Sequence, residues 1–151
     1  MKPEINKTLQ ILAQELIQRF SPLLDDEYEQ SRLNSWGTLL LLASFDLDEA
    51  TENLIEQNKM MKDFLIKYLK NIKDKQLSQD IEVLIVQKNL KYNMSSLDEL
   101  NQRFRDLLVR VQTYFETEEN LEALKDSWKI LRVMHGHRKV SHLLTLLREQ
   151  G

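Results

Sequence analysis

The sequence predicts an all-α protein, a single-domain bundle of five to seven mostly antiparallel helices that spans residues 1–151. Proline and glycine are the strongest interior helix breakers, and the chain has only two prolines and three glycines. Apolar residues recur at steps of three and four along most of the chain, which is the period of an amphipathic helix. A chain of this length has the size of one domain. We therefore expect one continuous helical core.

The first helix is expected over residues 3–20. Its apolar residues at helical spacing are Ile5, Leu9, Leu12, Leu16 and Phe20. Ser21 followed by Pro22 is typical of an N-cap with proline in the first turn, and it predicts the start of a second helix. Gly37 either ends that helix or lies inside it. We expect the helix to continue, because one glycine costs a helix only about 1 kcal/mol.

Two further helices are predicted in the middle of the chain. Asp46 and Glu49 have the spacing of a capping box and predict a helix that starts at Asp46 and reaches Ile72. A turn at residues 73–76 then leads to a helix that ends near Lys91. Part of that segment has the composition of a strand, but a lone strand would lack a partner, so a helix is preferred.

The last third of the chain predicts two or three helices. Ser96 and Glu99 form another capping box and mark a helix start. A break is expected at residues 116–120, although one long helix is the alternative. Gly136 separates the following helix from a short terminal helix over residues 140–147.

Charge is sorted along the chain, although the net charge of −3 is small. Residues 25–56 hold nine carboxylates and one arginine, whereas residues 59–75 hold six lysines and two aspartates. A stripe of lysines is expected on the solvent face of the third helix, namely Lys59, Lys62, Lys70 and Lys73. Separated signs are typical of a charge-polarised surface that steers a partner, or simply of a solvated surface. Nucleic acid is a less favoured partner, since no exposed aromatics alternate with the basic residues.

All three histidines lie between Met134 and His142, within a basic stretch. The candidate interaction residues of this stretch are Arg132, His135, His137 and Arg138. Their spacing does not favour a metal site, because His135 and His137 point about 200° apart on a helix. We therefore expect no metal ion and no cofactor. The bland alternative is a basic turn before the last helix.

Arg132 and His137 form an Arg-x4-His pattern. This pattern resembles the motif of HEPN-domain proteins, which are small helical bundles. The resemblance implies RNA binding or metal-independent RNA cleavage, in which the arginine stabilises phosphate charge and the histidine moves a proton. Arg132 and His137 are the candidate catalytic residues of that alternative function.

Trp36 and Gly37 precede four consecutive leucines, residues 39–42. This segment is expected to be the most buried helix or a contact surface. We expect Trp36 in the core, with a groove or a self-association interface as the alternative. In a chain so poor in glycine, Gly37 and Gly136 are expected to mark a turn or a close approach of two backbones.

The function predicted from these patterns is that of a non-enzymatic helical interaction or adaptor module that self-associates. Apolar residues lie beside the main stripes and widen them, which indicates a second buried face; they are Ile11, Ile17, Ile55, Phe64, Val83 and Val86. The chain has no cysteine, no pattern of a signal peptide and no apolar run of membrane-spanning length. We therefore expect a cytoplasmic protein whose partner is another protein or a second copy, and not a membrane.

Overall fold

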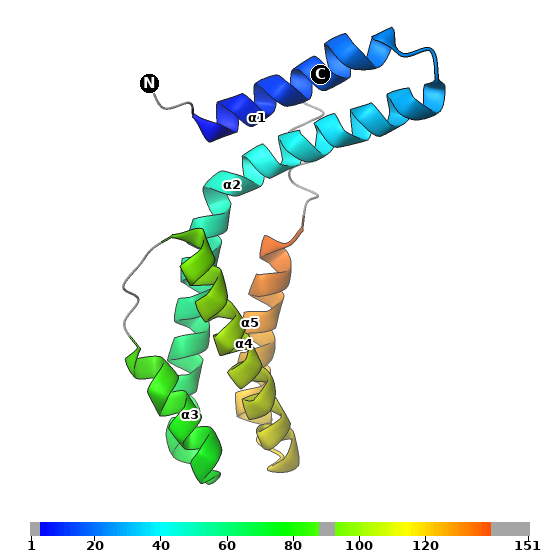
Figure 1. Ribbon diagram of the computed structural model, residues 1–151. Coiled ribbons are helices and arrows are strands. Elements are labelled where there is room, and N and C mark those ends of the chain that lie inside the picture. Colours follow the sequence, from blue (N-terminus) through cyan, green and yellow to red (C-terminus); the bar gives the residue numbers. More distant parts are fainter. Residues whose placement is uncertain (1–3, 88–92, 140–151) are drawn as a thin grey trace. The chain divides into compact units, whose positions relative to one another are not determined.

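The computed structural model describes residues 4–87 and 93–139, and these ranges are helical apart from short connections, with no strand among them (Figure 1). The predicted all-α class is confirmed. The described residues fall into two compact units, one made of residues 4–50 and the other of residues 51–87 and 93–139. The single domain remains a prediction.

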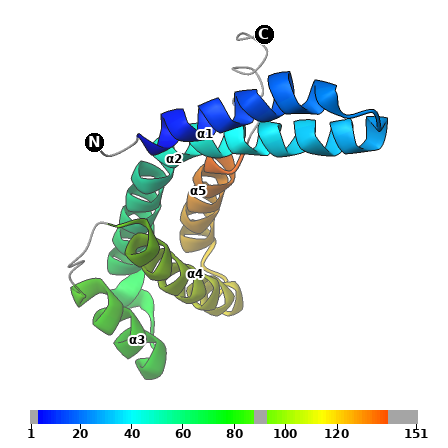
Figure 2. The same cartoon turned by 45° about the horizontal axis from the view of Figure 1, so that its top comes forward.

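The first unit is a helical hairpin. Helix α1 (Ile5–Gln14) continues through a π-helical segment, Glu15–Phe20, and a 3-10 turn, Ser21–Leu23. Helix α2 (Glu27–Tyr68) then runs back, and its first half lies alongside α1 in both views (Figures 1 and 2).

The tip of the hairpin corrects the predicted start of the second helix. The cap is Asp26, whose Oδ1 accepts the backbone N–H groups of Tyr28 at 2.8 Å and Glu29 at 3.4 Å. Pro22 instead lies in the 3-10 turn, and the backbone becomes extended at Leu24, where ψ is 136°. The prediction at Ser21 was wrong because two acceptable cap residues lie five positions apart, and the aspartate takes the role.

Helix α2 runs without a break through Gly37, as expected, and also through Asp46. The helix start predicted at Asp46 was therefore wrong. An acidic pair at a spacing of three also suits an exposed helix surface, so Asp46 and Glu49 do not by themselves require a terminus. The helix ends at Tyr68, and a 3-10 turn, Leu69–Asn71, follows it.

The second unit packs the end of α2 with helices α3 (Lys75–Val86), α4 (Met94–Thr117) and α5 (Leu121–His137). The predicted break at residues 116–120 is confirmed, and Glu119 adopts a positive φ of 52° there. The terminal helix predicted over residues 140–147 lies outside the described residues.

Asparagine or aspartate side chains cap the three helices that follow α2. Asp74 caps α3, Asn93 caps α4 by accepting the N–H of Ser96 at 2.8 Å, and Asn120 caps α5. The start predicted at Ser96 is therefore corrected to Met94, because the side chain of Asn93 accepts the backbone N–H of Ser96, which a capping box would have paired with the side chain of Glu99.

The hydrophobic core lies in the second unit. It joins all four of that unit's helices through large side chains, with Met61, Leu65, Ile81, Phe104, Val111, Phe115, Ile130 and Met134 among its members. Of the apolar residues that are buried in the described part of the chain, only Ala13 belongs to the hairpin.

Candidate interaction surface

The contact between α1 and the first half of α2, which we call the seam of the hairpin, has small residues at its buried positions. A Cβ atom placed on Gly37 would lie 2.5 Å from Cγ1 of Ile17 and 3.1 Å from the carbonyl oxygen of Ala13. Both contacts are shorter than side chains normally make, so a Cβ atom at this position would displace the side chain of Ile17 and crowd the backbone of Ala13. The expected close approach at Gly37 is confirmed. At Gly136 it is wrong, since a Cβ there would meet nothing within 4 Å.

Beside this tight seam, the large apolar side chains of the hairpin are half-buried or exposed, and none of those described is fully buried. Within residues 4–50 the buried positions are all small, namely Ala13, Ser21, Gly37 and Ser44. Leu39 is 62% exposed and Trp36 is 52% exposed. A hairpin of two helices therefore forms without enclosing a single large side chain in its described part.

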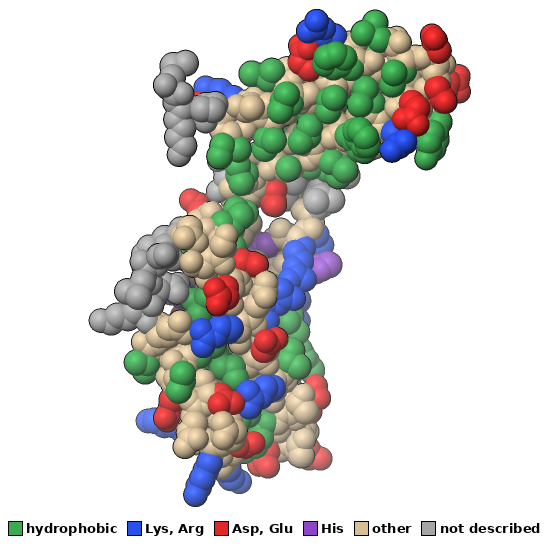
Figure 3. All heavy atoms as spheres, in the orientation of Figure 1, with side chains coloured by type: hydrophobic (Ala, Val, Ile, Leu, Met, Phe, Trp, Pro, Cys, Tyr) green, Lys and Arg blue, Asp and Glu red, His purple; other side chains and the backbone are tan. Residues whose placement is uncertain are grey.

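Several apolar side chains lie on one side of the hairpin, and four of them, Ile5, Leu12, Trp36 and Leu39, are exposed. At 100° per residue, Trp36 and Ala43 lie about 100° to 120° from Gly37 around α2. Ile5 and Leu12 lie at similar angles from Ala13 around α1, and in an antiparallel pair these two flanks belong to the same side. We call this surface the hairpin face: Ile5, Leu12, Trp36, Leu39, Leu40, Ala43 and Leu47. Hydrophobic side chains dominate the visible side of the hairpin in Figure 3.

The position of Trp36 corrects the prediction that it belongs to the core. Trp36 precedes Gly37 by one residue, so it is turned about 100° out of a seam that is too narrow for an indole. The guanidinium carbon of Arg32 lies 5.4 Å from the indole ring, and Nη1 of Arg32 is 3.0 Å from Oε1 of Glu29. The leucine segment, residues 39–42, is not the most buried helix either, because the narrow seam leaves no room to enclose its side chains.

Among the described residues of the histidine stretch, His137 is the one that enters a polar cluster. Its Nδ1 lies 3.0 Å from Nε2 of Gln57, and its Nε2 lies 3.3 Å from Oε2 of Glu56. Behind Gln57, the cluster continues to Asn101 and then to Asn58, and all three amide side chains are buried. The cluster joins α2, α4 and α5 within the second unit.

One backbone carbonyl sets the direction of every hydrogen bond in this cluster. Nδ2 of Asn58 donates to the carbonyl oxygen of Leu97 at 3.0 Å, so Oδ1 of Asn58 must accept from Nδ2 of Asn101. Nδ2 of Asn101 also donates to Oε1 of Gln57 at 3.3 Å, which leaves the NH2 group of Gln57 to donate to His137. Nδ1 of His137 is thus an acceptor, and the imidazole carries its proton on Nε2, which donates to Glu56.

The other candidates of the histidine stretch do not join this cluster. Arg132, His135 and Arg138 are exposed, and His142 lies outside the described residues. Arg132 and His137 leave α5 about 140° apart, and His135 and His137 leave it about 200° apart. The structure therefore does not bring together the arginine and histidine of the Arg-x4-His pattern. Among the described residues, no three histidine, aspartate or glutamate side chains are placed to hold a metal ion.

The basic stripe is less regular than the sequence predicted. Lys59, Lys70 and Lys73 are exposed, whereas Lys62 is half-buried. Since α2 ends at Tyr68, the last two lysines do not continue its helical face. Nζ of Lys73 lies 3.7 Å from Oε2 of Glu118 on the neighbouring connection.

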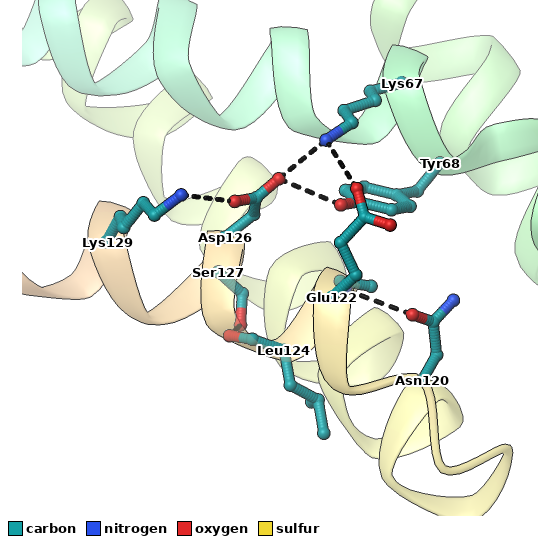
Figure 4. Close-up of polar contacts among 9 residues, drawn as sticks. Lys67, Tyr68, Asn120, Glu122, Leu124, Asp126, Ser127 and Lys129 are labelled. Atoms are coloured by element: carbon teal, nitrogen blue, oxygen red, sulfur yellow. Dashed lines mark hydrogen bonds and ion pairs between the residues drawn. The ribbon is translucent and has the colours of Figure 1, made fainter.

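An ion-pair network between α2 and α5 was not predicted from the sequence (Figure 4). Oδ2 of Asp126 accepts from Nζ of Lys67 at 2.7 Å and from the hydroxyl of Tyr68 at 2.9 Å, and Oδ1 accepts from Nζ of Lys129 at 2.7 Å. These three donors, Lys129 first, hold the pKa of Asp126 well below its usual range. Asp126 in turn raises the pKa of Lys67. Only the pair of Asp126 with Lys129, three residues apart on one helix, left a signal in the sequence.

Replacing Asp126 with asparagine is expected to lower the free energy of unfolding by about 1–2 kcal/mol at neutral pH. Because the pKa of Asp126 is lowered by folding, its contribution is present above the unfolded value near 3.9 and is lost as the pH falls below it. Urea denaturation from pH 7 down to pH 2 should therefore give a steeper acid loss for the wild type than for the variant. Parallel pH profiles would contradict this assignment.

Comparison of the chain with protein families, with curated protein sequences and with solved structures finds no match. No helix in the described part of the chain is long and apolar enough to cross a membrane.

Proposed function

We propose that the protein is a non-enzymatic helical interaction module that self-associates through the hairpin face. One observation carries this proposal: the described part of the hairpin buries none of its large apolar side chains and displays several of them together on one side. Apolar patches of this kind on water-exposed surfaces are typical of interaction sites. Cytoplasmic localisation belongs to the same proposal.

A second copy of the chain is the occupant that this surface fits best. The exposed apolar area of the hairpin face is on the order of several hundred Å², and a standard interface buries about 800 Å² per partner. All seven of its residues are uncharged, so two such faces meet without burying an unpaired ion. Two hairpins placed face to face form a four-helix bundle, in which each helix gains a second layer to pack against.

The polar cluster around His137 gives less support to the alternative function, RNA cleavage by Arg132 and His137, than the hairpin face gives to self-association. Both ring nitrogens of His137 are engaged by Gln57 and Glu56, and Arg132 leaves α5 in another direction. Satisfied hydrogen bonds of this kind position helices, and they are typical of a structural role. An interaction module without a cofactor thus remains the proposal that the side chains favour.

Size-exclusion chromatography with light scattering tests the proposal. The wild type is expected to elute with a mass of at least two chains, and Leu39→Glu is expected to elute as a monomer, because a carboxylate would be buried in an apolar interface. Val109→Glu is the matched control: Val109 is 60% exposed on α4, outside the hairpin face, so that variant should keep the wild-type mass.

Circular dichroism of both variants checks that the helices remain. A wild type that stays monomeric at the highest attainable concentration would refute self-association. A loss of mass in Val109→Glu equal to that in Leu39→Glu would place the interface elsewhere.

A further inference from the structure

We infer that the second copy binds in an antiparallel orientation across a two-fold axis, with α2 against α2 and Trp36 of each copy over Ala43 of the other. This inference rests on the proposed self-association and adds its geometry. It is confined to residues 27–50 of α2, which belong to the hairpin unit.

Large and small side chains are complementary along one stripe of α2. Trp36 and Ala43 are seven residues, or nearly two turns, apart on the same flank, and Leu39 and Leu40 lie midway between them. In an interface between identical copies related by a two-fold axis, residue i contacts residue j and j contacts i. With the axis at Leu39 and Leu40, each large indole meets the small side chain of an alanine on the other copy.

The distribution of charge along α2 also favours the antiparallel register. Arg32 is the only cation among residues 25–56, which also hold nine carboxylates. The antiparallel register that pairs Trp36 with Ala43 brings Arg32 of one copy opposite Leu47 of the other, beside the exposed Asp46. A parallel register would instead place Arg32 against Arg32 and Trp36 against Trp36, which opposes like charges and stacks the two largest side chains.

Cysteine crosslinking tests this register directly. Because the native chain contains no cysteine, only the introduced cysteines can react. Trp36→Cys and Ala43→Cys variants, mixed and allowed to re-equilibrate before treatment with a short bismaleimide, are expected to give a crosslinked dimer of one copy of each. Each variant alone is expected to give a much lower yield of crosslinked dimer. A second pair, Arg32→Cys with Leu47→Cys, keeps Trp36 in place and should behave in the same way.

A size swap tests the same contact without a crosslinker. Trp36→Ala and Ala43→Trp are each expected to weaken the dimer at least tenfold in dissociation constant, one by leaving a cavity and the other by a clash of two indoles. The double variant, Trp36→Ala with Ala43→Trp, exchanges the two sizes and is expected to recover most of the wild-type affinity.

The outcomes separate this inference from the proposed function. A dimer whose mixed variants do not crosslink, or whose single variants crosslink to themselves as efficiently as the mixture, would overturn the antiparallel register and leave self-association standing. A double variant as weak as the two single variants would overturn the pairing of Trp36 with Ala43. A monomeric wild type would overturn both.

Discussion

Replacing Asn101 with alanine is expected to lower the free energy of unfolding by about 2–4 kcal/mol. Asn101 is 2% exposed, and its Nδ2 donates at 3.0 Å to Asn58 and at 3.3 Å to Gln57. Its removal leaves two buried amide oxygens without donors and opens a cavity between α2 and α4. Chemical denaturation followed by circular dichroism measures the loss.

Gln102→Ala is the matched control for this variant. Gln102 is the next residue on α4, but it is exposed and donates only to Asp98 on the same helix, at 2.9 Å. Its replacement should change stability by less than about 0.5 kcal/mol. Equal effects of the two substitutions would show that the buried amides of α2 do not depend on Asn101.

A second large effect is expected at Gly37, where leucine should destabilise the hairpin by about 3 kcal/mol. Leucine is a good helix former, so the loss would come from the seam, where even a Cβ atom meets Ile17 at 2.5 Å. Hydrogen exchange of α1 amides should rise strongly, and the mass of the association product should fall to that of one chain.

The other interior glycine, Gly136, provides a control in which a substitution is expected to raise stability. Gly136 lies in the last turn of α5, and a Cβ there meets nothing within 4 Å. Gly136→Ala should therefore stabilise the protein by about 0.5–1 kcal/mol, through helix propensity alone. A loss of stability in Gly136→Ala, or unchanged exchange in Gly37→Leu, would contradict this difference between the two glycines.

The fold class was predictable because it depends on local properties of the chain. The rarity of proline and glycine and the period of the apolar residues act within a few turns, and they correctly predicted that the described chain is helical, although they divided α2 into two helices at Asp46. Helix starts were less accurate because serine, aspartate and asparagine cap almost equally well. In the structure Asp26 and Asn93 cap the helices in place of Ser21 and Ser96.

The candidate surface and the buried cluster depend on contacts that no local pattern specifies. Gln57 and Asn101 lie 44 positions apart in the sequence, and nothing near either of them indicates the other. Trp36 shows a different difficulty. An apolar stripe has the same appearance in a sequence whether its own chain or another chain covers it, so the core and the interface could not be separated until the narrow seam at Gly37 was seen.

The small residues at the seam have a consequence for the order in which the two units unfold. The second unit holds the large buried side chains and can gain its stability from its own chain, whereas the described positions of the hairpin are buried only at Ala13, Ser21, Gly37 and Ser44. If a second copy supplies the missing layer, the stability of the hairpin depends on protein concentration while that of the second unit does not. Dilution would then open the chain in two steps, with the amides of α1 exchanging long before those of α4.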